Sequence, residues 1–427
     1  MNLKELDLKH IWHPCTQMKD HEFLPLLTVK NAKGVYLYDY NNKAYIDCIS
    51  SWWVNLFGHC NEYINSKITE QLSKLEHVLL AGCSHEGVIR LSARLCKLLK
   101  EHKLNKCFYA DNGSSSIEIA LKMAFHYFAN KNEKRKKFLA LSNSYHGETV
   151  AALSVGDVKL YKKHYEDLLL DVLLTPVAQG EDFSKELEFL EKLLEKEGEN
   201  ICAFILEPLI QCAGNMHMYS ANFIDEAVKL CRKYGILIIF DEVAVGFGRT
   251  NTMFALEQSK AKPDLLCLSK GITGGYLPLS VLICTDEIYN AFYDDYEKNK
   301  AFLHSHSYTG NALACAAANA VLDIFENDNV LENNKILSKF IKNEFESLKE
   351  FDFLGNFRQC GMVYAFDIIK NKRQRAGLFV YEKALEKGLL LRPLANTIYF
   401  MPPFVIKNDE VSYVVSSLRE IFSTNQL

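Results

Sequence analysis

Apolar, strand-like runs alternate with segments of helical periodicity through the middle of this 427-residue chain, and this alternation restricts the possible folds most strongly. Most of the runs are apolar along their whole length, as strands are when helices cover both faces of their sheet. The alternation predicts βαβ units and a mostly parallel sheet, an α/β class of fold. The predicted strands are 106–110, 137–142, 202–208, 235–243, 263–269 and 279–285.

Two amphipathic segments between these runs are predicted helices. In the segment 183–197, leucines at helical spacing mark one apolar face, which is typical of a helix that covers a sheet. The second helix begins near Gly113, where Ser115 is followed three residues later by Glu118, the pattern of a capping box. Both helices are expected to pack on the predicted sheet.

The last hundred residues differ in character from the middle of the chain. A long helical stretch from about residue 310 into the 340s precedes shorter strands at 362–369 and 397–403, which predicts a smaller α+β domain. A hairpin at 34–48 is expected to join that domain. We therefore predict a large α/β domain over 55–310 and a small domain built from 1–54 and 311–427.

Composition excludes several classes of partner and site. The formal net charge of −4 gives no general attraction to nucleic acid or to anionic lipid. The 13 cysteines are odd in number and none are spaced C-x-x-C, so we expect reduced thiols, no metal site and a cytoplasmic protein. The beginning of the chain lacks the pattern of a secretion signal, and no apolar run is long enough to predict a membrane span.

Polar side chains stand where the predicted strands end. Ligands of open parallel sheets bind beyond the carboxyl ends of the strands, so these side chains are candidates for a binding site. They are Asp111 to Ser114, the loop after Ser142, Glu207, Asp241 with Glu242, and Lys270.

Lys270 and Asp241 suit a particular cofactor. Lys270 precedes its neighbouring glycines, the reverse of the order in a phosphate-binding P-loop, so a nucleotide site of that kind is excluded. An amine that bonds to an aldehyde and a carboxylate that pairs with a pyridine nitrogen together fit pyridoxal phosphate. A buried Asp–Lys salt bridge is the alternative that spacing alone leaves open.

Two further segments fit the same cofactor. Gly113 and Ser114 at a predicted helix start supply free N–H groups and a hydroxyl for a phosphate, although an ordinary helix cap has the same appearance. Tyr145, in "SYHGET" after a predicted strand, supplies a ring that could stack on the cofactor, and a simple turn is the alternative.

The stretches "FDEVAVGFGRT" (240–250) and "KPDLLCLSKGITGGYLPLS" (262–280) resemble the signature of class III pyridoxal-phosphate aminotransferases. The likeness extends over nearly the whole chain and implies fold type I of the pyridoxal-phosphate enzymes. It is greatest to the branch of that family that acts in biotin synthesis, through "HIWHPCTQM" (10–18), "SSWWVNLFGH" (50–59) and "LLLRPLANTIYFMPP" (389–403).

The resemblance implies a role for each cofactor residue. Lys270 would bond to pyridoxal phosphate and move the substrate proton, while Asp241 would pair with the pyridine nitrogen. Tyr145 would stack on the ring. Gly113 and Ser114 would hold the phosphate, together with Ser307 from the second subunit of a homodimer.

The resemblance also implies the substrates. The amino group of S-adenosylmethionine would pass to 8-amino-7-oxononanoate and give 7,8-diaminononanoate. The substrate residues would be Trp52, Trp53, Tyr145, Gly310, Arg392 and Tyr399, with Arg249 nearby and Glu207 as a structural partner. Arg392 would bind the acceptor's carboxylate, because a guanidinium matches a carboxylate with two hydrogen bonds.

The chain departs from the family pattern at two places. Cys15 stands where an aromatic residue that shapes the donor pocket is usual, so the donor could be lysine instead of S-adenosylmethionine. His306 and Ser307 replace a proline and a threonine, and the serine keeps the hydroxyl for phosphate. The rival functions are another class III enzyme that acts on ornithine or 4-aminobutyrate, and a silent dimer that only binds the cofactor or a protein.

Overall fold

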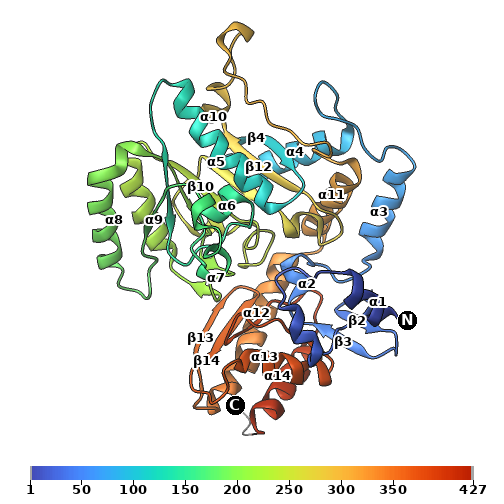
Figure 1. Cartoon of the computed structure of the whole chain (residues 1–427). Helices are drawn as coiled ribbons and strands as arrows, with labels where there is room; N and C mark the ends of the chain where they lie inside the picture. The colour runs from blue at the N-terminus through green and yellow to red at the C-terminus, as the bar shows by residue number, and fades with distance from the viewer. Residues whose placement is uncertain (1, 425–427) are drawn as a thin grey trace.

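A seven-stranded sheet in the order β4-β12-β11-β10-β7-β5-β6 lies in the upper half of the computed structural model, which describes residues 2–424 (Figure 1). Strands β11, β10, β7, β5 and β6 are each parallel to the next, whereas β12 is antiparallel to both of its neighbours, β4 and β11. The strands are β4 (Leu104–Ala110), β5 (Lys137–Leu141), β6 (Val172–Thr175), β7 (Ile201–Leu206), β10 (Leu237–Asp241), β11 (Leu265–Leu268) and β12 (Ser280–Thr285).

The six predicted strands are therefore confirmed, and so is the prediction of a mostly parallel sheet in an α/β fold. The alternation of apolar runs did not predict β6, because this edge strand is only four residues long and three of these are only partly buried. Strand β7, in contrast, is buried at every residue, as the continuous apolar run in its sequence indicates.

Helices pack on this sheet and on one another. α5 packs against β11, β12 and β7, α8 packs against α9, and α11 packs against α3 and α4. The predicted helix at 183–197 is confirmed as α8. The helices of this half are α3 (Glu62–Leu72), α4 (Glu86–Leu98), α5 (Gly113–Asn130), α6 (Val150–Ser154), α7 (Lys159–Lys162), α8 (Ser184–Glu197), α9 (Ala221–Arg232), α10 (Asp286–Asn290) and α11 (Ala312–Asn327).

The predicted capping box at the start of α5 is wrong. Asn112 is the N-cap, and its side chain accepts a hydrogen bond of 3.0 Å from the N–H of Ser115. Glu118 instead accepts hydrogen bonds from the N–H groups of Ala151 and Ala152 in α6. The end of β4 at Ala110 places Asn112 where the helix begins, so Ser115 lies inside the helix.

Both ends of the chain build the lower half (Figure 1). One sheet has the order β1-β2-β3-β15, and β3 pairs in parallel with β15 although the two are far apart in the sequence. The other sheet has the order β13-β14-β16. These strands are β1 (Val29–Lys33), β2 (Tyr36–Asp39), β3 (Ala44–Asp47), β13 (Leu354–Cys360), β14 (Val363–Ile368), β15 (Leu389–Leu390) and β16 (Thr397–Phe400).

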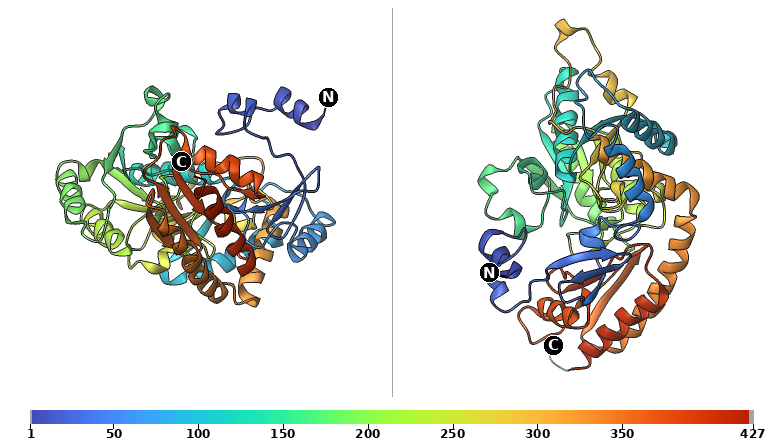
Figure 2. Two further views of the ribbon diagram at one scale, coloured as in Figure 1. Left: turned by 90° about the horizontal axis from the view of Figure 1, so that it is seen from below. Right: turned by 90° about the vertical axis from the view of Figure 1, so that its right-hand side faces the viewer.

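Three long helices complete the lower half, and the short α1 (Leu3–His10) lies at its edge beside the N-terminus (Figure 2). The hairpin predicted at 34–48 is present as β2 and β3. The domain division at 54/55 and 310/311 stays a prediction; α11, just after residue 310, packs against helices of the upper half. The long helices are α12 (Val330–Glu346), α13 (Ala376–Glu386) and α14 (Asn408–Phe422).

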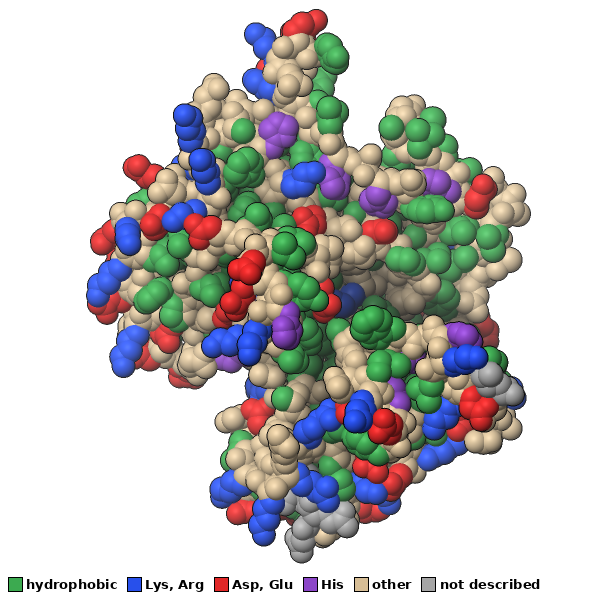
Figure 3. All heavy atoms as spheres, in the orientation of Figure 1, with side chains coloured by type: hydrophobic (Ala, Val, Ile, Leu, Met, Phe, Trp, Pro, Cys, Tyr) green, Lys and Arg blue, Asp and Glu red, His purple; other side chains and the backbone are tan. Residues whose placement is uncertain are grey.

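The surface is hollowed between the two halves, and side chains of both charges are scattered around the hollow (Figure 3). Within residues 2–424, none of the helices combines the length and the apolar character that a membrane crossing requires.

Candidate active site

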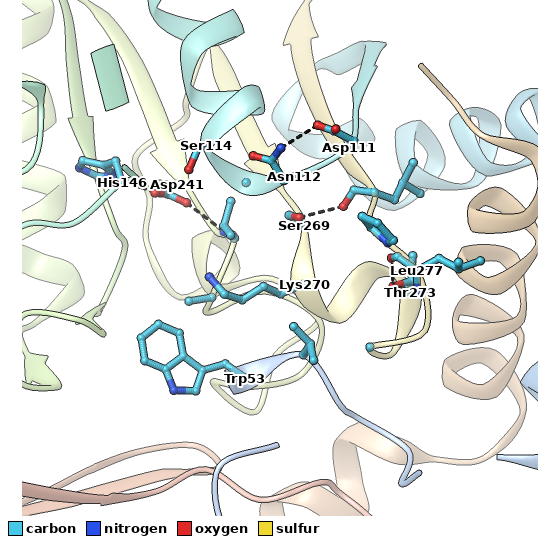
Figure 4. Close-up of a pocket in the computed structure, with 18 of the residues that line it drawn as sticks. Trp53, Asp111, Asn112, Ser114, His146, Asp241, Ser269, Lys270, Thr273 and Leu277 are labelled. Carbon is cyan, nitrogen blue, oxygen red and sulfur yellow. Dashed lines mark hydrogen bonds and ion pairs between the residues drawn. The ribbon is translucent and has the colours of Figure 1, made fainter. Parts of the chain in front are cut away.

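A cavity of about 400 Å³ lies beyond the carboxyl ends of β4, β5, β7, β10 and β11 (Figure 4). This is the edge of the sheet at which the sequence places its polar residues. The structure brings six of the predicted site residues together in the lining of the cavity: Trp53, Gly113, Ser114, Tyr145, Asp241 and Lys270.

Lys270 stands two residues after the end of β11 and has a φ of 46°, in the left-handed region. Its side chain and that of Trp53 point toward one another, with the amine 5.1 Å from the centre of the indole ring (Figure 4). Burial lowers the pKa of the Lys270 amine, and the negative charge of Asp241 opposes that shift. The amine is therefore closer to its neutral, reactive form than an exposed lysine is.

Asp241 is the last residue of β10 and is almost fully buried. Its Oδ2 lies 2.7 Å from Nδ1 of His146, and its Oδ1 accepts a hydrogen bond of 3.0 Å from the N–H of Val243. These two contacts fix the carboxylate while it faces the cavity, where it can pair with a protonated ring nitrogen. The role of His146 was not predicted, although the residue lies in the "SYHGET" stretch that the sequence singles out.

The start of α5 forms the phosphate end of the cavity. A side chain at position 113 is excluded, because a Cβ there would lie 2.7 Å from Cγ1 of Val243. Gly147, with a φ of 128°, passes so close to Ser114 that its own Cβ would lie 2.1 Å from the serine Oγ. Backbone N–H groups and a hydroxyl therefore face the space where a phosphate would lie, and together with Lys270 and Asp241 they fit pyridoxal phosphate.

Glu207 closes the cavity from the end of β7. Its carboxylate accepts hydrogen bonds from the N–H groups of Tyr145 and Cys212, and burial raises its pKa to about 7. The expectation that Glu207 is a structural partner agrees with these contacts. Tyr145 is thereby held at the cavity wall by its backbone, and its hydroxyl donates a hydrogen bond of 3.0 Å to Glu148.

Trp52 and Arg392 lie together outside the cavity lining. The guanidinium of Arg392 lies 4.7 Å from the centre of the Trp52 ring and donates a hydrogen bond to the carbonyl of Cys15. The thiol of Cys15 lies 3.5 Å from the carboxylate of Glu148. Glu148 thus links this group to Tyr145, and its role here was not predicted from the sequence.

Tyr399 and Arg249 are buried behind the cavity wall. The hydroxyl of Tyr399 accepts a hydrogen bond of 3.1 Å from the indole nitrogen of Trp53. Arg249 is only 1% exposed and donates to the carbonyls of Asn55 and Pro402. Both residues therefore support the wall from behind, and neither lines the cavity itself.

Ser307 and Gly310 are not brought to the cavity of their own chain. Ser307 is exposed, and its carbonyl lies 2.6 Å from Nε2 of His77. The carbonyl of Gly310 lies 2.8 Å from Nε2 of His85. Their predicted roles, Ser307 in binding the phosphate of a second subunit and Gly310 in substrate binding, stay predictions.

Comparison with known proteins gives one consistent result. The profile of the family described as aminotransferase class-III matches residues 17–422. An adenosylmethionine-8-amino-7-oxononanoate aminotransferase from Helicobacter pylori is 58% identical over 98% of this chain and 97% of its own length.

Two solved structures have the same fold over almost the whole chain. The crystal structure of the adenosylmethionine-8-amino-7-oxononanoate aminotransferase from Methanocaldococcus jannaschii is 37% identical, with a TM-score of 0.95 over 100% of this chain and 99% of that one. The omega transaminase from Pseudomonas jessenii in complex with PMP is 25% identical, with a TM-score of 0.94 over 99% of this chain and 98% of that one.

Proposed function

We propose that this protein acts in biotin synthesis. The chain belongs to the class-III aminotransferase family and uses the family's pyridoxal-phosphate cofactor. It would transfer an amino group to 8-amino-7-oxononanoate and form 7,8-diaminononanoate, with S-adenosylmethionine as the donor. The observation that carries the proposal is the cavity in which Lys270, Asp241 and the start of α5 meet. The Helicobacter pylori relative carries the corresponding name.

When bound, pyridoxal phosphate supplies an electron-withdrawing ring that stabilises negative charge on the substrate carbon. The Nζ of Lys270 takes the proton from the amine-bearing carbon of the donor and later returns a proton to the acceptor carbon. Its lowered pKa suits this task, because a base must be neutral before it accepts a proton.

Asp241, Tyr145 and the start of α5 orient the cofactor. Asp241 presents a fixed negative charge to the ring nitrogen, because His146 and the N–H of Val243 hold both of its oxygens. The dipole of α5 and the hydroxyl of Ser114 bind the phosphate dianion. The ring of Tyr145 restricts the cofactor from one face.

The acceptor is a long apolar chain that ends in a carboxylate, and the tryptophans suit such a chain. Trp53 forms part of the cavity wall, and Trp52 lies next to Arg392 outside it. An acceptor extending from Lys270 past Trp53 would bring its carboxylate to Arg392. The guanidinium would then form two parallel hydrogen bonds with the carboxylate.

The proposal includes a homodimer in the cytoplasm. Ser307 and Gly310 would complete the site of the partner subunit, since neither lines the cavity of its own chain. The free cysteines of the described residues are consistent with a reducing compartment.

The test is a visible absorbance spectrum of the cofactor-loaded protein, recorded before and after separate additions of S-adenosylmethionine, lysine and ornithine. Conversion of the cofactor band by S-adenosylmethionine, followed by formation of 7,8-diaminononanoate when the acceptor is added, supports the proposal. Conversion by lysine alone would support the same acceptor but replace S-adenosylmethionine by lysine as the donor. The difference would then be attributed to Cys15 and Glu148. Conversion by ornithine alone, without product from 8-amino-7-oxononanoate, would overturn the proposal.

A further inference from the structure

Four consecutive residues, none of them glycine, have left-handed backbone conformations, and the last of them lines the cavity. They form the short turn α2 (Ser50–Trp53), with φ values of 51° at Ser50, 46° at Ser51, 71° at Trp52 and 73° at Trp53. Residues with a Cβ avoid this region, and when they occupy it they do so as single residues. A run of four is therefore strained, and the surrounding structure must hold it in place.

Asp47, at the end of β3, accepts two hydrogen bonds from this turn and one from the residue before it. The carboxylate is fully buried and accepts hydrogen bonds from the N–H and the hydroxyl of Ser51, at 2.9 and 2.8 Å. It also accepts a longer one, of 3.3 Å, from the N–H of Ile49. A buried carboxylate with this many donors is a strong, directional clamp.

His59 completes the clamp from the far side of the turn. Its Nε2 lies 2.9 Å from Oδ2 of Asp47, and its Nδ1 lies 3.2 Å from the side-chain amide of Asn55. The amide of Asn55 donates to Nδ1, so Nε2 carries the hydrogen that is donated to Asp47. The histidine therefore connects the two ends of the segment from Asp47 to Asn55.

Other parts of the chain hold the side chains of the turn and the backbone just after it. The hydroxyl of Ser50 donates to the carbonyl of Met401, and Arg249 donates to the carbonyl of Asn55. Trp53 donates to Tyr399 through its indole nitrogen. The turn is thus fixed jointly by the first 60 residues, by the loop after β10 and by the segment around β16.

We propose that Asp47 and His59 are positioning residues that hold this left-handed turn, and that the turn sets the specificity for a long apolar acceptor. The inference rests on the proposed function for the identity of the acceptor. The clamped turn directs the two indoles to different places: Trp53 into the cavity beside Lys270, and Trp52 to the guanidinium of Arg392. A right-handed or mobile turn would remove one or both walls of the acceptor path.

Tryptophan fluorescence provides a readout that does not depend on activity. The chain has three tryptophans, and Trp12 is 87% exposed, so Trp12→Phe leaves Trp52 and Trp53 as the only reporters. In this background, Asp47→Asn and His59→Ala are expected to increase quenching by acrylamide and to lower fluorescence anisotropy. The matched control is Asp39→Asn, because Asp39 also accepts two backbone hydrogen bonds but in the exposed turn between β2 and β3.

Steady-state kinetics of the cofactor-loaded enzyme test specificity. Asp47→Asn is expected to raise the KM for 8-amino-7-oxononanoate about tenfold or more, the effect of losing a charged hydrogen bond that positions the wall. The KM for the amino donor and the absorbance of the bound cofactor should stay close to those of the parent protein. Unchanged quenching together with an unchanged acceptor KM would overturn the proposal.

A second pair of variants decides the question if Asp47→Asn fails to fold. Ser51→Ala and Ser51→Gly both remove the hydroxyl, but only glycine occupies a φ of 46° without strain. Ser51→Gly should therefore unfold at a higher temperature than Ser51→Ala, whereas at an ordinary position the alanine variant is the more stable. The opposite order would show that position 51 is not held in the left-handed conformation.

These measurements separate the two hypotheses. If the parent enzyme does not aminate 8-amino-7-oxononanoate, the proposed function fails, and the quenching and thermal experiments still report on the clamp. If the parent enzyme does aminate it and neither readout responds to the variants, only the clamp hypothesis fails.

Discussion

The chemistry of the site depends on single residues whose neighbours leave them little freedom. Lys270 has its amine 5.1 Å from the centre of the Trp53 indole, and the charge of Asp241 acts on that amine. Gly147 has its backbone directly against Ser114. At each of these two positions, one substitution has an effect that the structure predicts.

Lys270→Ala is expected to abolish turnover, because the variant loses both the covalent anchor of the cofactor and the base that moves the proton. The measurement is the formation of 7,8-diaminononanoate at saturating donor and acceptor. Lys262→Ala is the control, since that amine donates a hydrogen bond to the carbonyl of Glu101 at the surface. Normal turnover by Lys270→Ala would contradict the assigned role.

Gly147→Ala is expected to weaken cofactor binding about tenfold, because both the φ of 128° and the contact with Ser114 oppose a Cβ. Titration of the cofactor-free protein with pyridoxal phosphate, followed by absorbance, measures the dissociation constant. Gly180→Ala is the control, since a Cβ at that position meets nothing within 4 Å. Equal affinities for the two variants would show that the loop at 147 moves freely.

At the scale of elements, buried Glu242 connects the end of β10 to the helical turn η5 (Ala255–Gln258). Its two oxygens accept hydrogen bonds from the N–H groups of Ala255 and Leu256, at 2.6 and 2.7 Å. Burial nevertheless raises its pKa to about 8. The folded protein therefore binds a proton here between the ordinary pKa of a glutamate and about 8, whereas the unfolded chain does not.

The raised pKa of Glu242 predicts that stability falls as the pH rises through this range. Stability decreases with pH wherever the folded state binds more protons, so the free energy of unfolding should fall by roughly 2 kcal/mol between about pH 5 and pH 7 through this group. Glu242→Gln removes the titration. The unfolding midpoint in urea of the wild type should therefore decline relative to that of the variant as the pH rises, and a constant difference would contradict the prediction.

The elements also show what the sequence predicts and what it leaves open. The sequence predicts Asp241 and Lys270 at one edge of the sheet, because the apolar runs before them are recognisable as strands and parallel strands end at the same edge. The contact between Asp241 and His146 was not predicted, because it depends on how the loop after β5 folds back. The left-handed turn at Ser50 to Trp53 was not predicted either, since no glycine or asparagine marks it.

At the scale of the whole molecule, the proposed dimer predicts an effect of Tyr308. This side chain is 65% exposed and lies beside Ser307, against the ring of His77. If Ser307 reaches the phosphate of a partner subunit, Tyr308→Asp places a charge in the interface. Sedimentation should then show a shift from the mass of two chains to that of one, accompanied by weaker cofactor binding.

Phe189→Asp is the control for that experiment, because Phe189 is also about half exposed but lies on α8, at the side of the upper half (Figure 1). It should leave both the mass and the cofactor affinity unchanged. A single-chain mass for the unmodified, cofactor-loaded protein would remove the dimer from the proposal and leave the roles of Ser307 and Gly310 without support.

The pairing of β3 with β15 has a consequence for biosynthesis. Ile46 lies opposite Leu389, so the sheet that leads into the tryptophan turn cannot close until the ribosome has made the chain as far as residue 389. At ordinary rates of translation that delay is on the order of half a minute. The seven strands of the large sheet are all synthesised by residue 285, so the nascent chain has the strands around the cofactor site before it has the partner strand of the tryptophan turn.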